Sequence, residues 1–246
     1  MGTPFCVCSN FLSMFAELNN NTMITFNEIV YFDTETTGIP PKNASWTDRY
    51  EEFPHICQLS WIFNGKEEDH IIKPNGWTIP EETTAVHGIS TEYAMEHGEP
   101  LEDVIYKFIN DCKEAKLICG HNLYFDVSII KSELMRLGTY GESGAEEALY
   151  KGKRVDTMWS SSKWVNARRP NGAWKTPKLV ELYEKCFPGE SFPAHNAIED
   201  VRACMKCLPV LVENELVKLE VKTYPDEAKK PEEYKGELTI IRNYPF

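Results

Sequence analysis

Two acidic residues directly follow a short apolar run, and their spacing suits metal-dependent chemistry. The run Ile29–Phe32 leads into Asp33 and Glu35, which stand two positions apart. Side chains at positions i and i+2 of an extended strand leave the same face, so both carboxylates could reach one ion or a close ion pair. Taken alone, an Asp-x-Glu triplet is usually surface decoration. The metal hypothesis therefore depends on acids elsewhere in the chain.

Two later segments each place an acid beside a predicted strand end or loop. Residues 120–126 read GHNLYFD, and residues 195–200 read HNAIED. We expect Asp126 to open a helix directly after a strand, and His195 to lie in the loop before the helix that carries Asp200. Carboxylates brought together cannot all stay ionised without a counter-charge, and hard oxygen ligands favour Mg²⁺ or Mn²⁺. A lone histidine is usually structural, but the spacing to Asp200 and the other two motifs favour a functional role for His195.

Together these residues resemble the motifs of the DnaQ-like 3′–5′ exonucleases, specifically of their DEDDh branch. The family pattern is D-x-E, then H-N-x-x-F-D, then H-x-x-x-x-D, and the resemblance covers roughly residues 26–215. The segment Val86–Ile89 is similar to the family's V-H-G-I loop, and Val155–Thr157 resembles its later D-T strand end. No required motif position departs from the pattern. The resemblance implies an α/β, ribonuclease H-like fold with a central mixed five-stranded sheet flanked by helices.

The same resemblance implies roles for the five motif residues. Two divalent ions, Mg²⁺ or Mn²⁺, would lie about 3.5–4 Å apart and clamp a phosphodiester. Asp33 would bridge the ions, Glu35 and Asp200 would complete the inner site, and Asp126 would support it directly or through water. His195 would take the proton from the attacking water. The products would be nucleoside 5′-monophosphates.

In this family the terminal nucleotide is held by the first motif and the V-H-G-I loop. Five positions are therefore our substrate-binding candidates here: Thr36, Val86, His87, Asn122 and Phe125. Two of them have structural alternatives. His87 could instead cap a helix or hydrogen-bond within its own loop, and Phe125 is equally compatible with the core and with stacking on a base.

Charge is distributed unevenly along the chain. The formal net charge is −12 over 246 residues, which argues against tight, indiscriminate binding of nucleic acid because phosphates need local cations. Residues 151–178 nevertheless carry eight lysines and arginines against Asp156 alone, a net +7 that leaves −19 for the remainder. The sequence therefore contains one basic segment in an otherwise acidic protein.

Three tryptophans interleave with the cations of this basic segment: Trp159, Trp164 and Trp174. Aromatic faces next to cations suit the bases and phosphates of a single strand. Arg168 and Arg169 are the substrate-binding candidates of the segment. The alternative is a solvated basic loop with Trp159 in the core, and the pattern alone favours neither.

The expected elements place these residues around one sheet. The continuous apolar run at 29–32 is typical of a buried central strand. Residues 56–63 and 66–73 flank Asn64-Gly65, a strong hairpin signal because both turn positions tolerate positive φ. Further apolar patterns predict helices at 101–112, 125–137, 177–187 and 197–215, with strands at 117–119 and around Val155. Such an order indicates a mixed sheet covered by helices.

We expect three parts: an N-terminal extension of uncertain origin (1–22), an exonuclease domain (23–220) and a C-terminal extension (221–246). The first part lacks the features of a secretory signal, and Met23 is an alternative start. No apolar run approaches the roughly 18 residues of a membrane span, so we expect a cytoplasmic protein. The eight cysteines show no secreted-domain framework, and the lone CxxC at 204–207 is not expected to bind zinc.

Three functions compete. The favoured one removes nucleotides from the 3′ end of DNA, single-stranded or frayed, either alone or as a proofreading subunit beside a DNA polymerase in replication or repair. The second is an exoribonuclease that trims RNA, since no residue can be assigned from the sequence to reading the 2′-hydroxyl. The third is a non-catalytic module that binds 3′ ends or a protein partner. The presence of all five motif residues argues against the third.

Overall fold

The computed structural model describes residues 24–219, and Phe26–Val217 form one compact unit. The predicted extensions at 1–22 and 221–246 lie outside the described residues, so the domain boundaries stay predictions. Within the described range, no helix is both long enough and apolar enough to cross a membrane.

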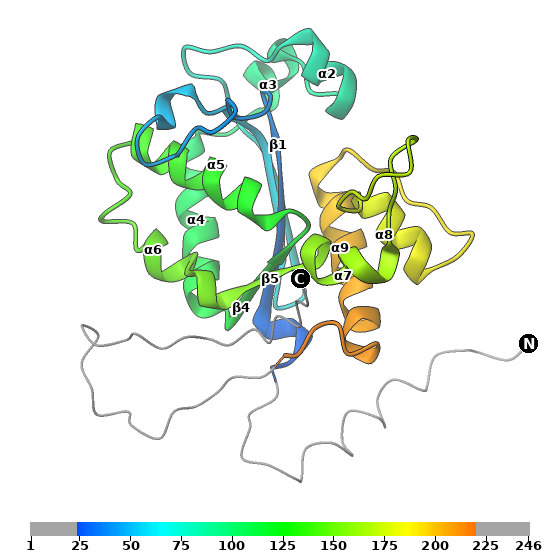
Figure 1. Ribbon diagram of the computed structural model, residues 1–246. Coiled ribbons are helices and arrows are strands. Elements are labelled where there is room, and N and C mark those ends of the chain that lie inside the picture. The colour runs from blue at the N-terminus through cyan, green and yellow to red at the C-terminus, as the bar shows by residue number, and fades with distance from the viewer. Residues whose placement is uncertain (1–23, 220–246) are drawn as a thin grey trace, which may run out of the picture. The chain divides into compact units, whose positions relative to one another are not determined.

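Five strands form one mixed sheet in the order β3-β2-β1-β4-β5, which confirms the predicted fold class (Figure 1). The middle strand β1 is antiparallel to β2 and parallel to β4, and β5 continues the parallel half. A tight turn joins β2 to β3, as predicted for a hairpin. The strands are β1 (Ile29–Thr36), β2 (Ile56–Phe63), β3 (Lys66–Ile71), β4 (Leu117–Gly120) and β5 (Arg154–Asp156).

Strand β1 is apolar at its start and acidic towards its end. Its first four side chains, Ile29–Phe32, are buried, as expected for a central strand. Asp33 and Glu35 still pair with β2, but the register shifts directly after Glu35, before Thr36. A bulge bends a strand and turns its side chains. This irregularity therefore affects the direction in which the carboxylates of Asp33 and Glu35 point.

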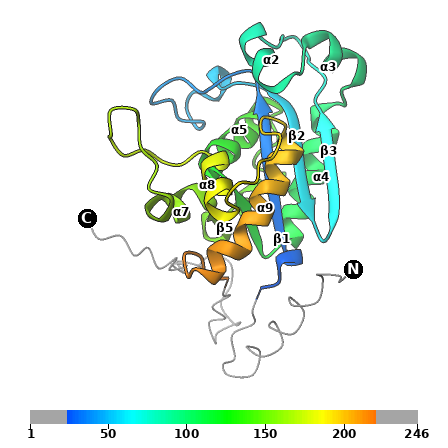
Figure 2. The ribbon, with the colours of Figure 1, turned by 90° about the vertical axis from the view of Figure 1, so that its right-hand side faces the viewer.

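Helices cover both faces of the sheet (Figures 1 and 2). In Figure 1 the sheet is seen edge-on, with α4 and α5 on one side and α7 to α9 on the other. On the first side the Phe32 ring packs against Phe108, with ring centroids 4.8 Å apart. On the second side α9 runs along β1 and β2. The helices are α2 (Glu81–His87), α3 (Thr91–His97), α4 (Leu101–Glu114), α5 (Leu123–Arg136), α6 (Ala145–Ala148), α7 (Thr157–Val165), α8 (Leu179–Cys186) and α9 (Ala197–Glu213), with short 3₁₀ turns at Phe26–Glu28, Tyr50–Glu52 and Lys151–Lys153.

The predicted long helices are confirmed, whereas α2, α3, α6 and α7 were not expected. Helices α2 and α3 have seven residues each, too few to show a sustained apolar period. Their sequence signals lie in the caps. Gly88 ends α2 with a φ of 79°, and the Ser90 hydroxyl accepts the Tyr93 backbone N–H at 3.1 Å to begin α3. Helix α7 lies in the basic segment, for which a solvated loop was one of the two alternatives.

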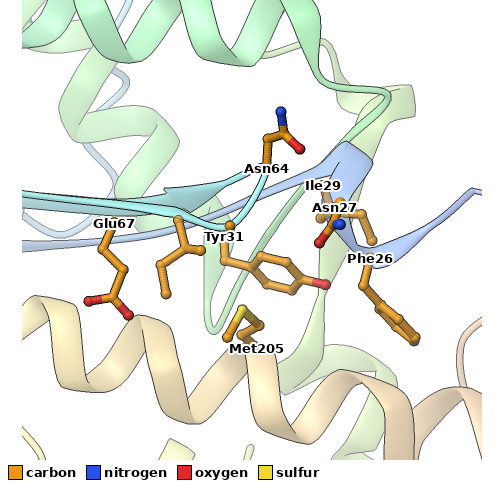
Figure 3. A pocket seen from close by; sticks show the side chains of 9 residues that line it. Phe26, Asn27, Ile29, Tyr31, Asn64, Glu67 and Met205 are labelled. Atoms are coloured by element: carbon orange, nitrogen blue, oxygen red, sulfur yellow. The ribbon is translucent and has the colours of Figure 1, made fainter. Parts of the chain in front are cut away.

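The carboxyl ends of β1, β4 and β5 meet at one edge because these strands run parallel. Ligands of open α/β sheets bind outside such an edge. A pocket lies towards the opposite end of β1, between Tyr31, Met205 of α9 and Asn64 of the β2–β3 turn (Figure 3). Its described lining holds one carboxylate, Glu67, so the acidic chemistry is located elsewhere.

Candidate active site

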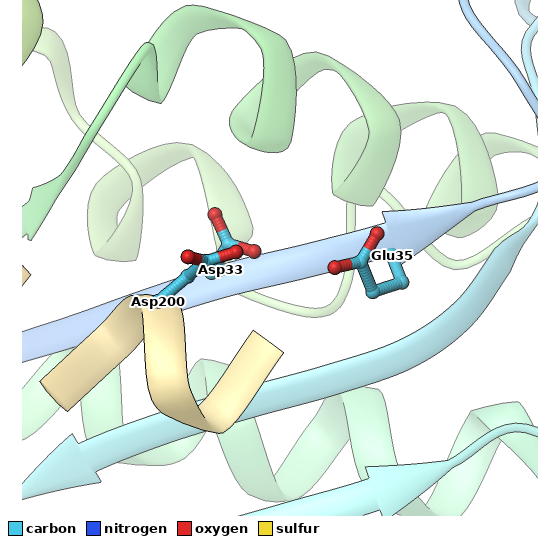
Figure 4. A group of neighbouring side chains, drawn as sticks. All are labelled: Asp33, Glu35 and Asp200. Carbon is cyan, nitrogen blue, oxygen red and sulfur yellow. The ribbon is translucent and has the colours of Figure 1, made fainter. Parts of the chain in front are cut away.

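Three carboxylates converge beside the second half of β1 (Figure 4). Asp33 and Glu35 come from β1, and Asp200 comes from the first turn of α9. One oxygen of each lies within 4.8 Å of the others. This spacing lets one cation contact all three groups. The structure thus brings together the first and third acidic motifs, which are about 165 positions apart in the sequence.

The three carboxylates repel one another in a confined place. Burial raises the pKa of Asp33 well above its usual value, and repulsion from the neighbouring carboxylates, Asp126 first, adds to the effect. Burial and repulsion from Asp200 and then Asp126 raise the pKa of Glu35 to about 7. Burial also raises the pKa of Asp200, to about 6. Crowded oxygen donors that resist ionisation fit a hard divalent cation, which would supply the missing counter-charge.

Asp126 is the most buried acid of the site and is held by β1. It lies in the first turn of α5, as predicted, with a 3% exposed side chain. Its Oδ1 accepts hydrogen bonds from the Thr34 backbone N–H at 3.1 Å and from the Thr34 hydroxyl at 2.7 Å. Burial raises its pKa to about 7, although these hydrogen bonds oppose the rise. Asp126 is outside the group of three converging oxygens, which fits a supporting position.

His195 lies in the loop directly before α9, as expected. Its side chain is exposed, and its backbone N–H donates to Asp200 Oδ2 at 3.1 Å. Its φ of 70° is in the left-handed region, which costs a non-glycine residue about 1–3 kcal/mol. The start of α9 is also fixed to the sheet, because the Ala197 N–H donates to Gln58 Oε1 of β2 at 3.3 Å. The histidine therefore stands at the rim of the acidic group.

Two residues that organise this edge were not among our predicted site residues. Asp156, which ends β5, accepts the backbone N–H groups of Asn122 and Leu123 at the start of α5 and of Met158 at the start of α7. Thr34 holds Asp126, as described above. Each had a signal in the sequence: the D-T pair at a strand end, and a hydroxyl between the two acids of the first motif.

His121 joins the end of β4 to the segment after α7. Its Nδ1 lies 3.0 Å from the Thr157 hydroxyl, and its Nε2 lies 3.0 Å from the Pro177 carbonyl oxygen. Burial lowers its pKa to about 4, so the ring is neutral near pH 7. His121 therefore links the end of β4 both to the start of α7 and to the chain at Pro177.

The V-H-G-I loop approaches the first motif through His87. Its Nδ1 accepts the Ile89 backbone N–H at 3.1 Å, which is the structural alternative we considered. Its buried Nε2 has no hydrogen-bond partner among the described residues, however. Burial lowers the pKa of His87, and the nearby Thr36 backbone opposes that lowering. Val86 beside it is 55% exposed. The loop therefore presents an exposed apolar side chain beside an imidazole that lies next to the Thr36 backbone.

The other two predicted contacts of the terminal nucleotide lie at the start of α5. Asn122 is exposed and adopts a φ of 71° as the residue before the helix. Phe125 is partly buried and packs against the main hydrophobic core. The core alternative for Phe125 is thus at least partly realised, and its stacking role stays a prediction.

Some cations of the basic segment bond to other parts of the fold, whereas others are exposed and form no ion pair within the described residues. Lys153 donates to the Ala115 carbonyl, Arg154 donates to the Leu149 carbonyl, and Lys175 pairs with Glu181 at 2.6 Å. By contrast, Arg168 and Arg169 are both exposed, and within residues 24–219 neither forms an ion pair. The alternative that buried Trp159 is wrong, since this side chain is 49% exposed on α7.

The cysteines of the CxxC lie inside the domain. Cys204 and Cys207 are buried on α9, and the Cys204 sulfur is 3.9 Å from the sulfur of Cys119 on β4. Both sulfurs are free thiols. The expectation about zinc stays a prediction.

Comparison with known proteins gives the family. The sequence profile of the exonuclease family RNase_T matches residues 30–208. No curated protein sequence matches the chain. Among solved structures, E. coli exonuclease I in complex with a dA16 oligonucleotide is similar, with a TM-score of 0.58 and 20% identity over 76% of this chain. So is the zinc-bound E. coli exonuclease I complex with single-stranded DNA, with a TM-score of 0.56 and 20% identity over 76% of this chain.

A bacterial relative of that enzyme gives the same result. Exonuclease I from Methylocaldum szegediense has a TM-score of 0.55 and 18% identity over 76% of this chain. In all three cases the match spans 40% of the solved chain, so this protein corresponds to well under half of those enzymes. These likenesses confirm the ribonuclease H-like fold. Because the family profile covers most of its length, the chain belongs to the RNase_T exonuclease family, within the DnaQ-like superfamily.

Proposed function

We propose that this protein is a 3′–5′ exonuclease of the DEDDh type that releases nucleoside 5′-monophosphates from DNA. The observation that carries the proposal is the convergence of Asp33, Glu35 and Asp200 within 4.8 Å, with His195 at the rim. Three crowded carboxylates with raised pKa values are unfavourable without a cation. A bound cation would offset the repulsion between these carboxylates. A site that needs such a cation is typical of a metal-dependent hydrolase.

The residues would divide the work as follows. Asp33, Glu35 and Asp200 would hold two Mg²⁺ or Mn²⁺ ions, with Asp33 shared between them. When bound, such ions supply an activated water and stabilise the charge on the leaving 3′ oxygen. Asp126, kept in place by Thr34, would fix the position of the inner site. His195 would accept the proton of the attacking water, since its exposed ring can lose that proton to solvent.

Selection of the chain end would come from the V-H-G-I loop and the first motif. Val86 offers an exposed apolar contact, and His87 Nε2 is a buried nitrogen without a partner beside the Thr36 backbone. Asn122 and Phe125 approach from α5. A terminal nucleotide bound between these two elements would have its 3′ end next to the carboxylates.

DNA is the proposed substrate, and RNA is the second candidate. The oligonucleotide complexes of the similar solved structures contain DNA, which supports DNA for the shared fold. No described side chain of the site can be assigned to the 2′-hydroxyl. Proofreading beside a DNA polymerase and a cytoplasmic location stay predictions.

The test is digestion of matched single-stranded DNA and RNA labelled at the 5′ end, in Mg²⁺, Mn²⁺ or EDTA. We expect a ladder that shortens from the 3′ end, mononucleotide products, no reaction in EDTA and faster loss of DNA. Asp33→Ala should abolish the ladder, whereas Asp103→Asn, at an exposed position of α4, should leave it unchanged. If wild type shortens neither polymer under any metal but still binds 3′ ends, the non-catalytic module replaces the exonuclease.

A further inference from the structure

The chain after α7 forms a small two-stranded arm over residues 167–175. The Lys175 N–H donates to the Ala167 carbonyl at 3.1 Å, and the Arg169 N–H donates to the Ala173 carbonyl at 2.8 Å. The turn at the tip is closed by the Gly172 N–H, which donates to the Arg169 carbonyl at 2.8 Å. The turn sequence Arg-Pro-Asn-Gly puts proline where φ is preset and glycine where φ is 80°. The arm is therefore an ordered hairpin.

Its hydrogen-bond pattern places an arginine and a tryptophan side by side. Arg168 and Trp174 form an antiparallel bridge, and the bonds described above involve their neighbours on both sides. They are thus a non-hydrogen-bonded pair, for which Cα atoms are about 4.5 Å apart and side chains are closest. Their side chains share one face of the arm. Arg169, the next residue, points to the opposite face.

This pair is oriented and exposed. The Arg168 Nη2 donates to Asn166 Oδ1 at 2.7 Å, so the guanidinium is held by a neutral partner that leaves its charge available. Trp174 is 45% exposed. No carboxylate occurs between residues 166 and 178. An exposed indole beside an unneutralised guanidinium offers a stacking surface for a base and a contact for the adjacent phosphate.

The arm is attached at the edge that carries the acids. Pro177, two residues after the arm, is anchored through its carbonyl oxygen to His121 at the end of β4. Helix α7, which leads into the arm, begins at Asp156, the residue that also caps α5. Figures 1 and 2 show this yellow-green hairpin projecting beyond α7 and α8. A strand whose 3′ end enters the site could therefore reach the arm with its upstream nucleotides.

We propose that Arg168 and Trp174 form a binding site for single-stranded nucleic acid upstream of the cleaved end, and that it makes the enzyme selective for unpaired 3′ tails. Stacking on Trp174 needs a base whose face is free, which a blunt duplex does not offer. Arg168 then binds the phosphate next to the stacked base. The proposal rests on the proposed function for its substrate but not on the chemistry of cleavage.

The experiment measures binding without cleavage, so a failure of catalysis cannot be mistaken for a failure of the arm. All variants carry Asp33→Asn and are kept in EDTA, and the affinity for a fluorescent oligothymidylate is read by anisotropy. We expect Trp174→Ala to weaken binding of the single strand at least fivefold, with little change for a blunt duplex. Trp174→Phe should restore most of the affinity because it keeps an aromatic face. Circular dichroism checks that each variant is folded.

A double-mutant cycle separates the pair from general electrostatic attraction. The effects of Arg168→Ala and Trp174→Ala on the binding free energy should be non-additive, because the two side chains contact the phosphate and the base of one nucleotide unit. Arg169→Ala is the matched control, since it removes the same charge one residue away on the other face, and it should add independently to Trp174→Ala. The proposal would be overturned if Trp174→Ala weakened single-strand binding less than twofold. It would also be overturned if the double-mutant cycles gave the same coupling to Trp174 for Arg168 and for Arg169.

Discussion

The acidic site and the arm at residues 167–175 differ in how their charged side chains are arranged. At the site, burial raises the pKa values of Asp33, Glu35 and Asp200, and repulsion between neighbouring carboxylates adds to the rise for Asp33 and Glu35. In the arm, Arg168 and Arg169 are exposed and unpaired within the described chain. The first arrangement is unfavourable until a cation arrives, and the second costs little but attracts phosphate over a distance. A protein with a net charge of −12 can therefore bind a polyanion through local cations.

The difference also separates two kinds of function. The acids proposed to do the chemistry are held by regular elements, with β1, α5 and α9 each fixing at least one of them. The groups proposed to hold the strand are exposed side chains of a hairpin. We expect substitutions at the site to change turnover and substitutions in the arm to change affinity. The following predictions test this division, from the largest effect to the smallest.

The largest effect is expected at the rim of the acidic site. Replacing His195 by alanine should lower kcat by about 10²–10⁴-fold, because general-base assistance is lost, while KM stays within about twofold. Rates are measured with single-stranded DNA in Mg²⁺. His97→Ala, at an exposed position on α3, serves as the control and should keep the wild-type rate. Unchanged kcat in His195→Ala would show that the base is another group.

A smaller loss is expected behind the site. Thr34→Val removes the hydroxyl that donates to Asp126 Oδ1 at 2.7 Å but keeps the backbone N–H donor. A hydrogen bond to a charged group contributes about 1.5–3 kcal/mol, so kcat should fall roughly tenfold or more. Thr34→Ser keeps the hydroxyl and should recover most of the rate. If Thr34→Val and Thr34→Ser have the same kcat, the Thr34 hydroxyl does not position Asp126.

The arm should change how binding depends on salt. Replacing Arg168 and Arg169 together by alanine should weaken binding and flatten the slope of log Kd against log salt by about 1.4, from about 0.7 for each phosphate contact to a single strand. The slope is measured in EDTA with Asp33→Asn protein between 50 and 200 mM salt, a range of about fourfold. An unchanged slope would exclude both arginines from phosphate binding.

The smallest effect concerns stability without metal. Because the folded pKa of Glu35 is about 7, the folded protein holds a proton that the unfolded chain has lost between about pH 4 and 7. The free energy of unfolding should thus fall as pH rises through this window. Glu35→Gln should raise Tm in EDTA by about 2–4 °C at pH 7.5, for roughly 1 kcal/mol, and leave it nearly unchanged at pH 4. A Tm difference that is equal at both pH values would contradict the crowding of charge.

The positions of the three acidic motifs could be predicted from the sequence because Asp33, Asp126 and Asp200 occupy long, regular elements. The apolar run before Asp33 predicted the central strand, and the helical period predicted the elements that carry Asp126 and Asp200. Local motifs could therefore be placed at one sheet edge. The family resemblance implies the roles of these residues, and the roles stay predictions.

The remaining parts depend on contacts that have no local pattern. Helix α7 begins because Asp156 caps it, and the same side chain caps α5 across the sheet edge. The anchor between His121 and Pro177 joins residues 56 positions apart. The pairing of Arg168 with Trp174 depends on the register of a nine-residue hairpin, residues 167–175. The sequence contains these side chains, but no local pattern indicates which of them lie together in the fold.

The most direct test of the account is divalent-ion binding by the acidic site, measured by calorimetry with Mn²⁺ near pH 7.5. Wild type should bind Mn²⁺, Asp33→Asn should weaken that binding at least tenfold, and Asp103→Asn should bind as wild type does. This result is predicted because burial and repulsion between carboxylates raise the pKa values of Asp33 and Glu35, and a bound divalent ion would offset both effects. Equal Mn²⁺ binding by wild type and Asp33→Asn would contradict the claim that these carboxylates form the metal centre of the nuclease.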